Sequence, residues 1–323
     1  MQITYTSDAS GITLKPKEDR GSLFGRLLGR GGLAINFEHL SEAEQDVMLA
    51  IADLRAFEDE NAGTVEFGPA EIRCSHDAAA ALSARGAQAL GLPADVHLMM
   101  HTDATGTIGH ADFRLRCEWT SHGQRVTPPR QGCILKTAEG HRRIPLWMKR
   151  ALDLADGFKA DAPIEDHWAV LAAFRQALEP GEDVPASLSD GGRMAGLAMT
   201  SFLKGLNVKL ADRFSLSPED NMADFDVVPF SGTSLSDHHI GDGDVTEADS
   251  EISGETLAAF QWKLHSLGAR PAYQLGNNTY LVIDRKAATA LQEIVRARKA
   301  PREERREFIA NPRAFITQAV AKE

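Results

Sequence analysis

The sequence predicts an α+β protein in which an antiparallel β-meander packs with helices and the C-terminal end is helical. Two observations carry this prediction. Residues 95–101 and 113–120 each alternate apolar and polar side chains with period two, which is typical of half-buried strands. From residue 146 the apolar residues recur at helical spacing instead. A few antiparallel strands with one apolar face need a second layer, and the neighbouring helical segments would supply it.

Size and charge narrow the function classes. The chain has 323 residues, which suggests about two domains, and its 43% apolar and 25% charged residues are ordinary for a globular protein. No apolar run approaches the ~20 residues that cross a bilayer, and the N-terminus lacks the pattern of a signal peptide. We therefore expect a cytoplasmic protein without membrane contact. The net charge of −11 weighs against strong nucleic-acid binding by the whole chain, although a local basic strip stays open.

The three cysteines, Cys74, Cys117 and Cys133, are isolated in the sequence and form no CxxC pair. We interpret them as small buried hydrophobic residues in a reducing compartment.

The first domain is expected over residues 1–180. Its first clear helix begins at Ser41, where Glu44 completes a capping box. Two short strand candidates and an Ala-rich helix follow, and then the meander over 92–137. Two further helices, starting near Leu146 and Pro163, would complete the domain.

The second domain is expected over residues 181–323, because residues 179–192 have the Pro, Gly, Ser and acidic composition of a linker. Strands are predicted over 206–210 and 225–230, and a helix over 254–267. The sequence Gly276-Asn277-Asn278 predicts a hairpin turn. Helices then fill residues 286–323, with starts at Ala287, Pro301 and Pro312.

Clustered cations are the first candidate binding residues. Arg114 and Arg116 alternate on the outward face of the meander, which they would share with His97 and His101 if the strands pair. Such cations suit a phosphate backbone or an acidic partner, but mixed with acids at helical spacing they are also typical of a solvent-facing helix. The candidate contacts for nucleic acid or a protein partner are Arg114, Arg116, Arg142, Arg143, Arg298, Lys299, Arg302, Arg305 and Arg306.

An acidic stretch over residues 231–251 is the one candidate metal site. Hard cations prefer several oxygen ligands, and histidine would add a transition-metal option. The order Asp242-Gly243-Asp244 does not match an EF-hand loop, and a solvated acidic loop is the plainer interpretation. The candidate ligands are Asp237, His238, His239, Asp242 and Asp244. A metal-dependent enzyme that uses residues 237–251 is therefore an alternative function.

The familiar catalytic motifs are missing from the sequence. It contains no phosphate-binding GxxxxGK[ST] loop, no GxSxG elbow, no HExxH pair and no Gly fingerprint between a strand and a helix. The residues alone therefore predict no catalytic site and no cofactor in this chain.

Several segments together resemble one protein family. In the meander they are Leu92-Pro93, Gly106–Gly109, Asp112–Leu115 and Ile144–Leu146; near the C-terminus they are Ala272–Gly276, Thr279–Asp284 and Pro301–Phe315, of which FxxNPRAF is the most distinctive piece. This pattern resembles the region ahead of the motor in large bacterial SNF2-type helicases. These are DNA-translocating ATPases of mobile and anti-phage defence gene clusters.

The resemblance implies a non-catalytic, N-terminal accessory or regulatory region that docks a partner, regulates the motor or positions DNA. The ATP-binding Lys loop and the acidic Mg²⁺ motif of the family do not occur here, so no catalytic residue can be carried over. ATP and Mg²⁺ would be bound only by a motor, attached after Glu323 or encoded apart. The implied partners are this motor, other defence proteins and DNA. A stand-alone protein-interaction module is the remaining alternative.

Overall fold

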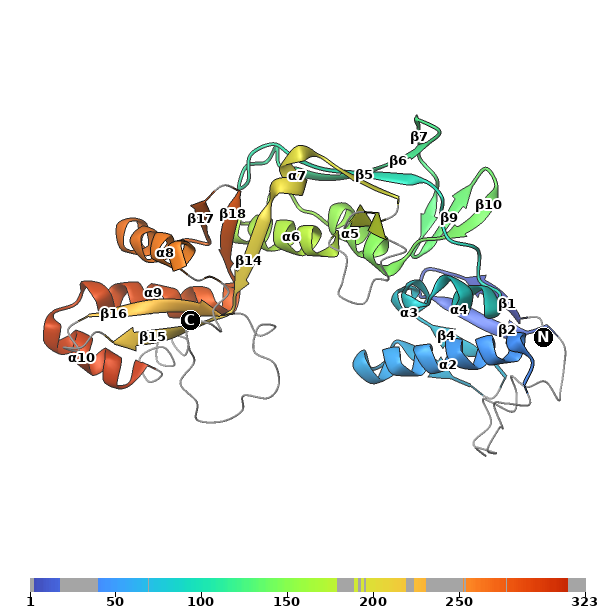
Figure 1. Cartoon of the computed structure of the whole chain (residues 1–323), viewed down its shortest axis with the longest axis horizontal. Coiled ribbons are helices and arrows are strands. Elements are labelled where there is room, and N and C mark those ends of the chain that lie inside the picture. The colour runs from blue at the N-terminus through green and yellow to red at the C-terminus, as the bar shows by residue number, and fades with distance from the viewer. Residues whose placement is uncertain are drawn as a thin grey trace. The chain divides into compact units, whose positions relative to one another are not determined.

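The computed structural model describes residues 3–17, 40–68, 70–178, 189–190, 193–194, 196–218, 224–230, 252, 254–276 and 278–312. The predicted α+β class is confirmed (Figure 1). Within the described residues, no helix is both long enough and apolar enough to span a membrane.

The chain forms two compact units, and each is assembled from separate segments. Unit 1 comprises Met1–Thr102, Cys117–Asp156 and Ala177–Ala198, and unit 2 comprises Asp103–Arg116, Gly157–Gln176 and Met199–Glu323. This organisation differs from a single boundary near residue 180. The reason is long-range packing inside unit 2, where Trp168 stacks against Tyr280 with ring centroids 5.1 Å apart and Arg175 Nε donates to the Leu206 carbonyl at 3.1 Å.

The N-terminal part of unit 1 is a four-stranded antiparallel sheet with three helices. The strand order is β1-β2-β4-β3, and α2 packs on α3 and α4 (Figure 1). The elements are β1 (Ile3–Ser7), β2 (Ile12–Pro16), α2 (Glu42–Glu60), β3 (Val65–Phe67), β4 (Ile72–Cys74), α3 (His76–Ala81) and α4 (Ala84–Ala89). The predicted capping box begins α2, because the Ser41 amide donates to Glu44 Oε2 at 2.9 Å. Leu14, Ile51, Leu54 and Ile72 fill the core between the layers.

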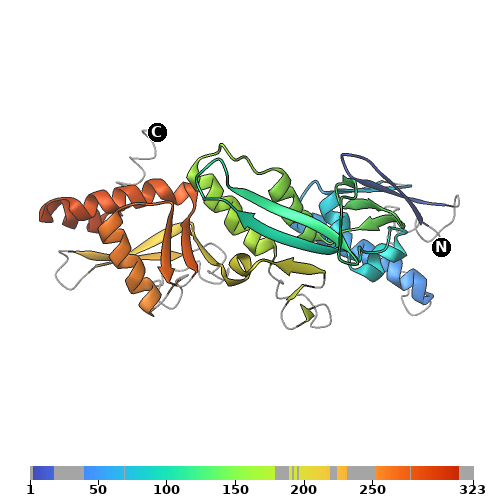
Figure 2. The same cartoon turned by 90° about the horizontal axis from the view of Figure 1, so that it is seen from above.

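The predicted meander is present as a sheet with the order β13-β5-β6-β7, in which β5 and β6 run side by side (Figure 2). Its strands are β5 (Met99–Thr105), β6 (Arg114–Ser121), β7 (Gln124–Val126) and β13 (Leu197–Met199). The first strand begins at Met99 and not at Val96. The earlier residues pair elsewhere, because Val96 N donates to the Arg143 carbonyl at 2.8 Å and Arg143 N donates to the Ala94 carbonyl at 2.9 Å.

A second small sheet completes unit 1. It has the order β10-β9-β8 and lies next to α5 in the chain. Its strands are β8 (Arg130–Gln131), β9 (Ile134–Thr137) and β10 (Gly140–Arg143), and α5 (Leu146–Asp156) follows. A separate two-stranded sheet pairs β11 (Ser189–Asp190) with β12 (Arg193–Met194). Helix α5 agrees with the predicted change of period after Pro145, and it buries Met148, Ala151 and Leu152.

The connection between β5 and β6 belongs to unit 2, where it packs against helix α6 (Ile164–Ala177). The Gly109 amide donates to Nδ1 of the buried His167 at 3.0 Å, and the His167 ring stacks on Phe113 with centroids 5.5 Å apart. Gly109 has φ +85°, and a Cβ there would approach Ile164 to 2.8 Å. Glycine is therefore required at this contact by both conformation and space.

The rest of unit 2 is a three-stranded mixed sheet, a two-stranded ribbon and helices. The sheet has the order β14-β18-β17, with β14 parallel and β17 antiparallel to β18, and β15 pairs with β16. The elements are α7 (Ser201–Gly205), β14 (Asn207–Ala211), β15 (Arg213–Pro218), β16 (Phe225–Phe230), α8 (Gly254–Leu267), β17 (Ala272–Gly276), β18 (Thr279–Ile283), α9 (Arg285–Lys299) and α10 (Arg302–Ala310).

The sequence predictions for unit 2 hold for α8, the β17–β18 hairpin and the presence of α9 and α10. Helix α9 begins at Arg285, two residues before the predicted Ala287, and Pro301 is the N-cap of α10. The helix predicted from Pro312 falls almost entirely outside the described residues. One apolar core joins the ribbon, the sheet and the helices. Its largest fully buried members are Phe225, Phe260 and Tyr273.

Candidate functional site

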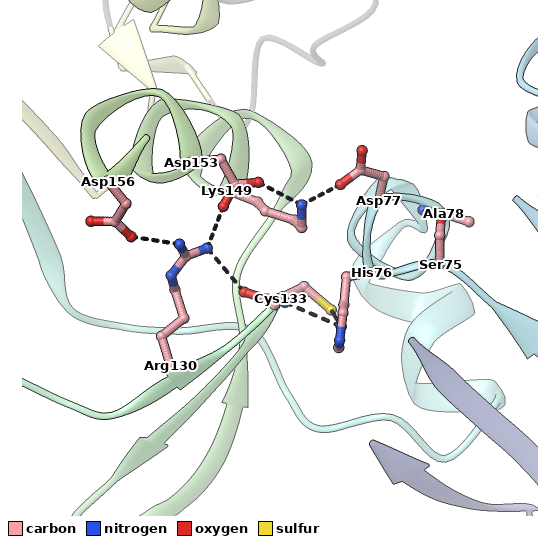
Figure 3. Close-up of polar contacts among 10 residues, drawn as sticks. Ser75, His76, Asp77, Ala78, Arg130, Cys133, Lys149, Asp153 and Asp156 are labelled. Atoms are coloured by element: carbon pink, nitrogen blue, oxygen red, sulfur yellow. Dashed lines mark hydrogen bonds and ion pairs between the residues drawn. The ribbon is translucent and has the colours of Figure 1, made fainter. Parts of the chain in front are cut away.

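Five ionisable side chains of unit 1 form a polar cluster, which Figure 3 draws: Asp77, Arg130, Lys149, Asp153 and Asp156. Lys149 Nζ lies 2.5 Å from Asp77 Oδ1 and 2.6 Å from Asp153 Oδ2. Arg130 donates to Asp153 at 2.7 Å and to Asp156 at 2.6 Å. Two cations thus share one carboxylate, and the cluster ties α3, β8 and α5 together.

The electrostatics of the polar cluster hold its groups in their charged forms. Burial opposes the charge on Lys149, but its hydrogen bonds to Asp153 and Asp77 outweigh that penalty and raise the lysine pKa. Burial likewise acts against the Asp153 carboxylate, and the bonds from Lys149 and Arg130 prevail, so the pKa of Asp153 is lowered. A lysine nucleophile or base needs a lowered pKa, and Lys149 has the opposite shift. The cluster is therefore suited to holding the fold together.

A cysteine and a histidine meet beside this cluster, also in Figure 3. Cys133 Sγ lies 3.5 Å from Nδ1 of His76, and the Cys133 amide donates to the same nitrogen at 3.3 Å. His76 Nε2 lies 2.8 Å from the Asp8 carbonyl oxygen. Since a carbonyl only accepts, Nε2 donates to Asp8, and Nδ1 accepts from the Cys133 amide. Gly132 has φ +55°, and a Cβ there would overlap the His76 ring.

All three thiols are in their protonated form. Burial raises the pKa of Cys133 to about 11 and the pKa values of Cys74 and Cys117 to about 12. A nucleophilic or metal-binding cysteine needs an accessible thiolate. The Cys133–His76 pair therefore lacks the electrostatics of a catalytic dyad. Cys74 and Cys133 are buried core residues, as the sequence predicts, whereas Cys117 is only partly buried.

Arg143, one of the predicted contact residues, is 1% exposed. Its Nε and Nη2 both lie 2.7 Å from Asp95 Oδ1, and its Nη1 donates to the Ala79 carbonyl at 2.8 Å and the Leu82 carbonyl at 2.7 Å. The guanidinium thus closes the C-terminal end of α3 and joins it to the 94–96 segment. In this fold Arg143 is a structural residue, and its charge is not presented to a partner.

Some of the other predicted cations form contacts within their own unit, and others stay exposed. Arg298 packs inward: it donates to the Phe225 carbonyl at 2.9 Å, lies 5.6 Å from the centre of the Phe225 ring and faces Asp224 and Asp226. Arg305 also faces Asp224, at 3.9 Å. Arg142 pairs with Glu139 at 2.8 Å, and Arg114 donates to two carbonyls at its own strand end. The predicted cations that stay exposed are Arg114, Arg116, Lys299, Arg302 and Arg306.

The predicted metal ligands Asp237, His238, His239, Asp242 and Asp244 lie outside the described residues. Within the described part of the chain, no group of three or more His, Cys, Asp or Glu side chains is placed to hold a metal ion.

The structure also reveals a depression on the meander sheet, which we call the histidine pocket. It has a volume of about 520 Å³ and is lined by His97, Met99, His101, Thr120, Ser121, His122, Gly123, Leu197 and Ala198. The predicted pairing of the strands is confirmed, because His101 Nε2 lies 3.0 Å from Thr120 Oγ1 across the sheet.

The sequence signals only part of the histidine pocket. Period two points to His97 and His101 on one face. The contribution of His122 depends on its turn, where it takes φ +48° before Gly123 at φ +79°. The contribution of Leu197 and Ala198 depends on the pairing of β13 with β5, which no local pattern predicts.

Comparison with models of known protein families and with curated protein sequences finds no match for this chain.

Proposed function

We propose that this chain is a non-catalytic docking region of a bacterial SNF2-type DNA translocase, that its role is to bind and regulate the motor, and that it acts in the cytoplasm. The proposal combines the family resemblance of the sequence with one structural observation. Of the C-terminal segments that carry the resemblance, Ala272–Gly276 forms β17, Thr279–Asp284 contains β18, and Pro301–Phe315 contains α10 and extends beyond the described residues. The observation is an exposed tryptophan on α8 of the same unit.

Helix α8 buries one apolar face in the core of unit 2 and also carries two large apolar residues that are exposed. Leu257, Phe260 and Leu264 are buried, and Phe260 packs edge-to-face on Tyr273 with centroids 5.2 Å apart. Trp262 is nevertheless 67% exposed and Leu267 is 52% exposed. The core is thus already supplied by other residues, and Trp262 contributes little to it. Tryptophan is enriched among the residues that dominate the energy of protein–protein binding, which supports a protein partner for α8.

The charge distribution favours docking over DNA positioning. The net charge of −11 repels a phosphate backbone. Two of the C-terminal arginines, Arg298 and Arg305, face Asp224 and so are partly neutralised within the unit. The exposed cations of α10 alternate with Glu303, Glu304 and Glu307. Contact with DNA through Arg302 and Arg306 is therefore the secondary version of the proposal.

The test compares two tagged variants with the wild-type chain in its own host. Trp262→Ala removes the exposed indole, and Leu49→Ala on α2, which is 54% exposed, is the control for losing a surface apolar residue. We expect an ATPase with a phosphate-binding Lys loop and an acidic Mg²⁺ motif to co-purify with the wild type and the control. Since truncating one dominant interface residue costs about 2 kcal/mol or more, its recovery with Trp262→Ala should fall at least about tenfold.

Two results would overturn the proposal: ATP hydrolysis by the purified chain alone, or a wild-type preparation that carries no such ATPase. If the native gene product is longer than 323 residues and contains the motor, the same variants are compared for the DNA-stimulated ATPase rate. Equal rates in wild type and Trp262→Ala would then remove α8 from the interface.

A further inference from the structure

The histidine pocket is lined by imidazole and thioether side chains that the docking role does not use. Met99 and His101 occupy alternate positions at the start of β5 and so point to one face of the sheet, and His97, just before the strand, lines the same pocket. All three are exposed, and Met99, at 40%, is one of the more exposed large apolar residues among those described. The neighbouring Met100, on the opposite face, is fully buried. An accessible thioether therefore lies between two accessible imidazoles.

The spacing allows neighbouring members of this set to share an ion. Residues two apart on an extended strand have Cα atoms roughly 6.6 Å apart, which two long side chains span when they bind one ion. Met99 and His101 have this relation within β5. His97 lies just before the strand, where the backbone bends at Leu98, and lines the same pocket.

The hydrogen bond of His101 provides a second and independent observation. Its Nε2 lies 3.0 Å from Thr120 Oγ1. Metal-binding histidines commonly donate the N–H of one ring nitrogen to a fixed acceptor, which orients the ring and leaves the lone pair of the other nitrogen for the metal. Thr120 lines the pocket as well, so it can hold His101 with Nδ1 available.

The lining decides which class of ion fits. None of the nine lining residues is acidic, which disfavours Ca²⁺ and Mg²⁺ because these ions need several oxygen ligands. Thioether ligands select soft ions, above all Cu(I), and imidazole also binds copper. The described residues contain no cluster of three His, Cys, Asp or Glu ligands. A site of two imidazoles and one thioether does not require such a cluster.

We propose that the histidine pocket is a Cu(I)-binding site, with Met99 Sδ, His101 Nδ1 and a His97 ring nitrogen as ligands and Thr120 as the residue that positions His101. The inference is independent of the docking function, because its residues lie in unit 1 and the docking residues lie in unit 2.

The experiment is an anaerobic titration of the full chain with Cu(I) against a chromophoric Cu(I) chelator. Met99→Leu conserves volume and removes the thioether, and His101→Gln removes the imidazole. Met199→Leu on β13 and His265→Gln on α8 are matched controls, since neither residue lines the pocket. We expect one Cu(I) per wild-type chain, affinity lowered at least tenfold in each pocket variant, and unchanged affinity in both controls. X-ray absorption of the wild-type complex should show one sulfur ligand, which Met99→Leu eliminates.

Two outcomes would overturn the proposal. The first is a wild-type chain that does not compete with the chelator. The second is Cu(I) binding that is equal in wild type and Met99→Leu, which would place the copper elsewhere in the chain. Circular dichroism of each variant separates loss of a ligand from loss of the fold. Because Met99 and His101 are exposed, we expect native spectra for both pocket variants.

Discussion

At the scale of single residues, two arginines that are adjacent in the sequence have different roles. Arg142 and Arg143 form one basic pair in the sequence. In the structure Arg142 makes one surface ion pair with Glu139, whereas Arg143 is enclosed by Asp95 and two helix-end carbonyls. The alternation of β10 places consecutive side chains on opposite faces, and only one of those faces meets α3.

This difference gives the first prediction. Arg143→Met should lower the free energy of unfolding by about 2–4 kcal/mol, because it leaves Asp95 without its cation and two carbonyls without a donor. Arg142→Met should cost less than about 1 kcal/mol, as is usual for an exposed ion pair. Urea unfolding of the two variants checks this. Equal losses would mean that the Arg143 contacts are not important for stability.

At the scale of elements, α5 is attached to its surroundings by charge as well as by apolar packing. Met148, Ala151 and Leu152 form its buried face, and Lys149 and Asp153 connect it to α3 and β8. Lys149 and Asp153 are one turn apart on the helix, which allows them to pair with each other as well.

The lowered pKa of Asp153 makes this attachment depend on pH. Its folded pKa lies below the unfolded value of 3.8, so the stabilising contribution is present above that value and is lost as pH falls through the folded pKa. Asp153→Asn should therefore be less stable than the wild type at pH 7, and the difference should shrink below about pH 4.

Thermal unfolding between pH 7 and pH 3 measures this effect. Asp59→Asn, an exposed carboxylate on α2, is the control for removing one negative charge. A stability difference between wild type and Asp153→Asn that stays constant over the whole pH range would rule out the assignment.

At the scale of the whole molecule, segments of the two units alternate along the chain. Unit 2 needs residues 157–176, which precede the linker-like stretch, and this segment brings Trp168 to Tyr280 and Arg175 to the Leu206 carbonyl. A cut at residue 180 would therefore remove part of unit 2.

A truncation series tests this organisation. We expect a fragment of residues 181–323 to exchange the β14 and β18 amides much faster than the full chain, because α6 no longer covers Tyr280. A fragment of residues 157–323 should recover part of the protection. Identical exchange in the 181–323 fragment and the full chain would show that unit 2 is complete without α6.

Features that depend on nearby residues are predictable from local sequence patterns. The capping box of α2, the period of β6, the boundaries of α8 and the turn between β17 and β18 are local features, and each is present. His97 and His101 line one pocket, as period two predicts, although β5 itself begins only at Met99.

Local sequence patterns do not predict how distant segments combine, which depends on tertiary packing. Residues far apart in the chain meet where β14 pairs in parallel with β18 and where β13 pairs with β5. They also meet around the buried Arg143. Such contacts arise from the packing of whole elements, and a local pattern of residues does not encode which elements will meet. The same holds for the histidine pocket, because its strand residues are visible in the sequence and its remaining walls are supplied by a turn and by β13.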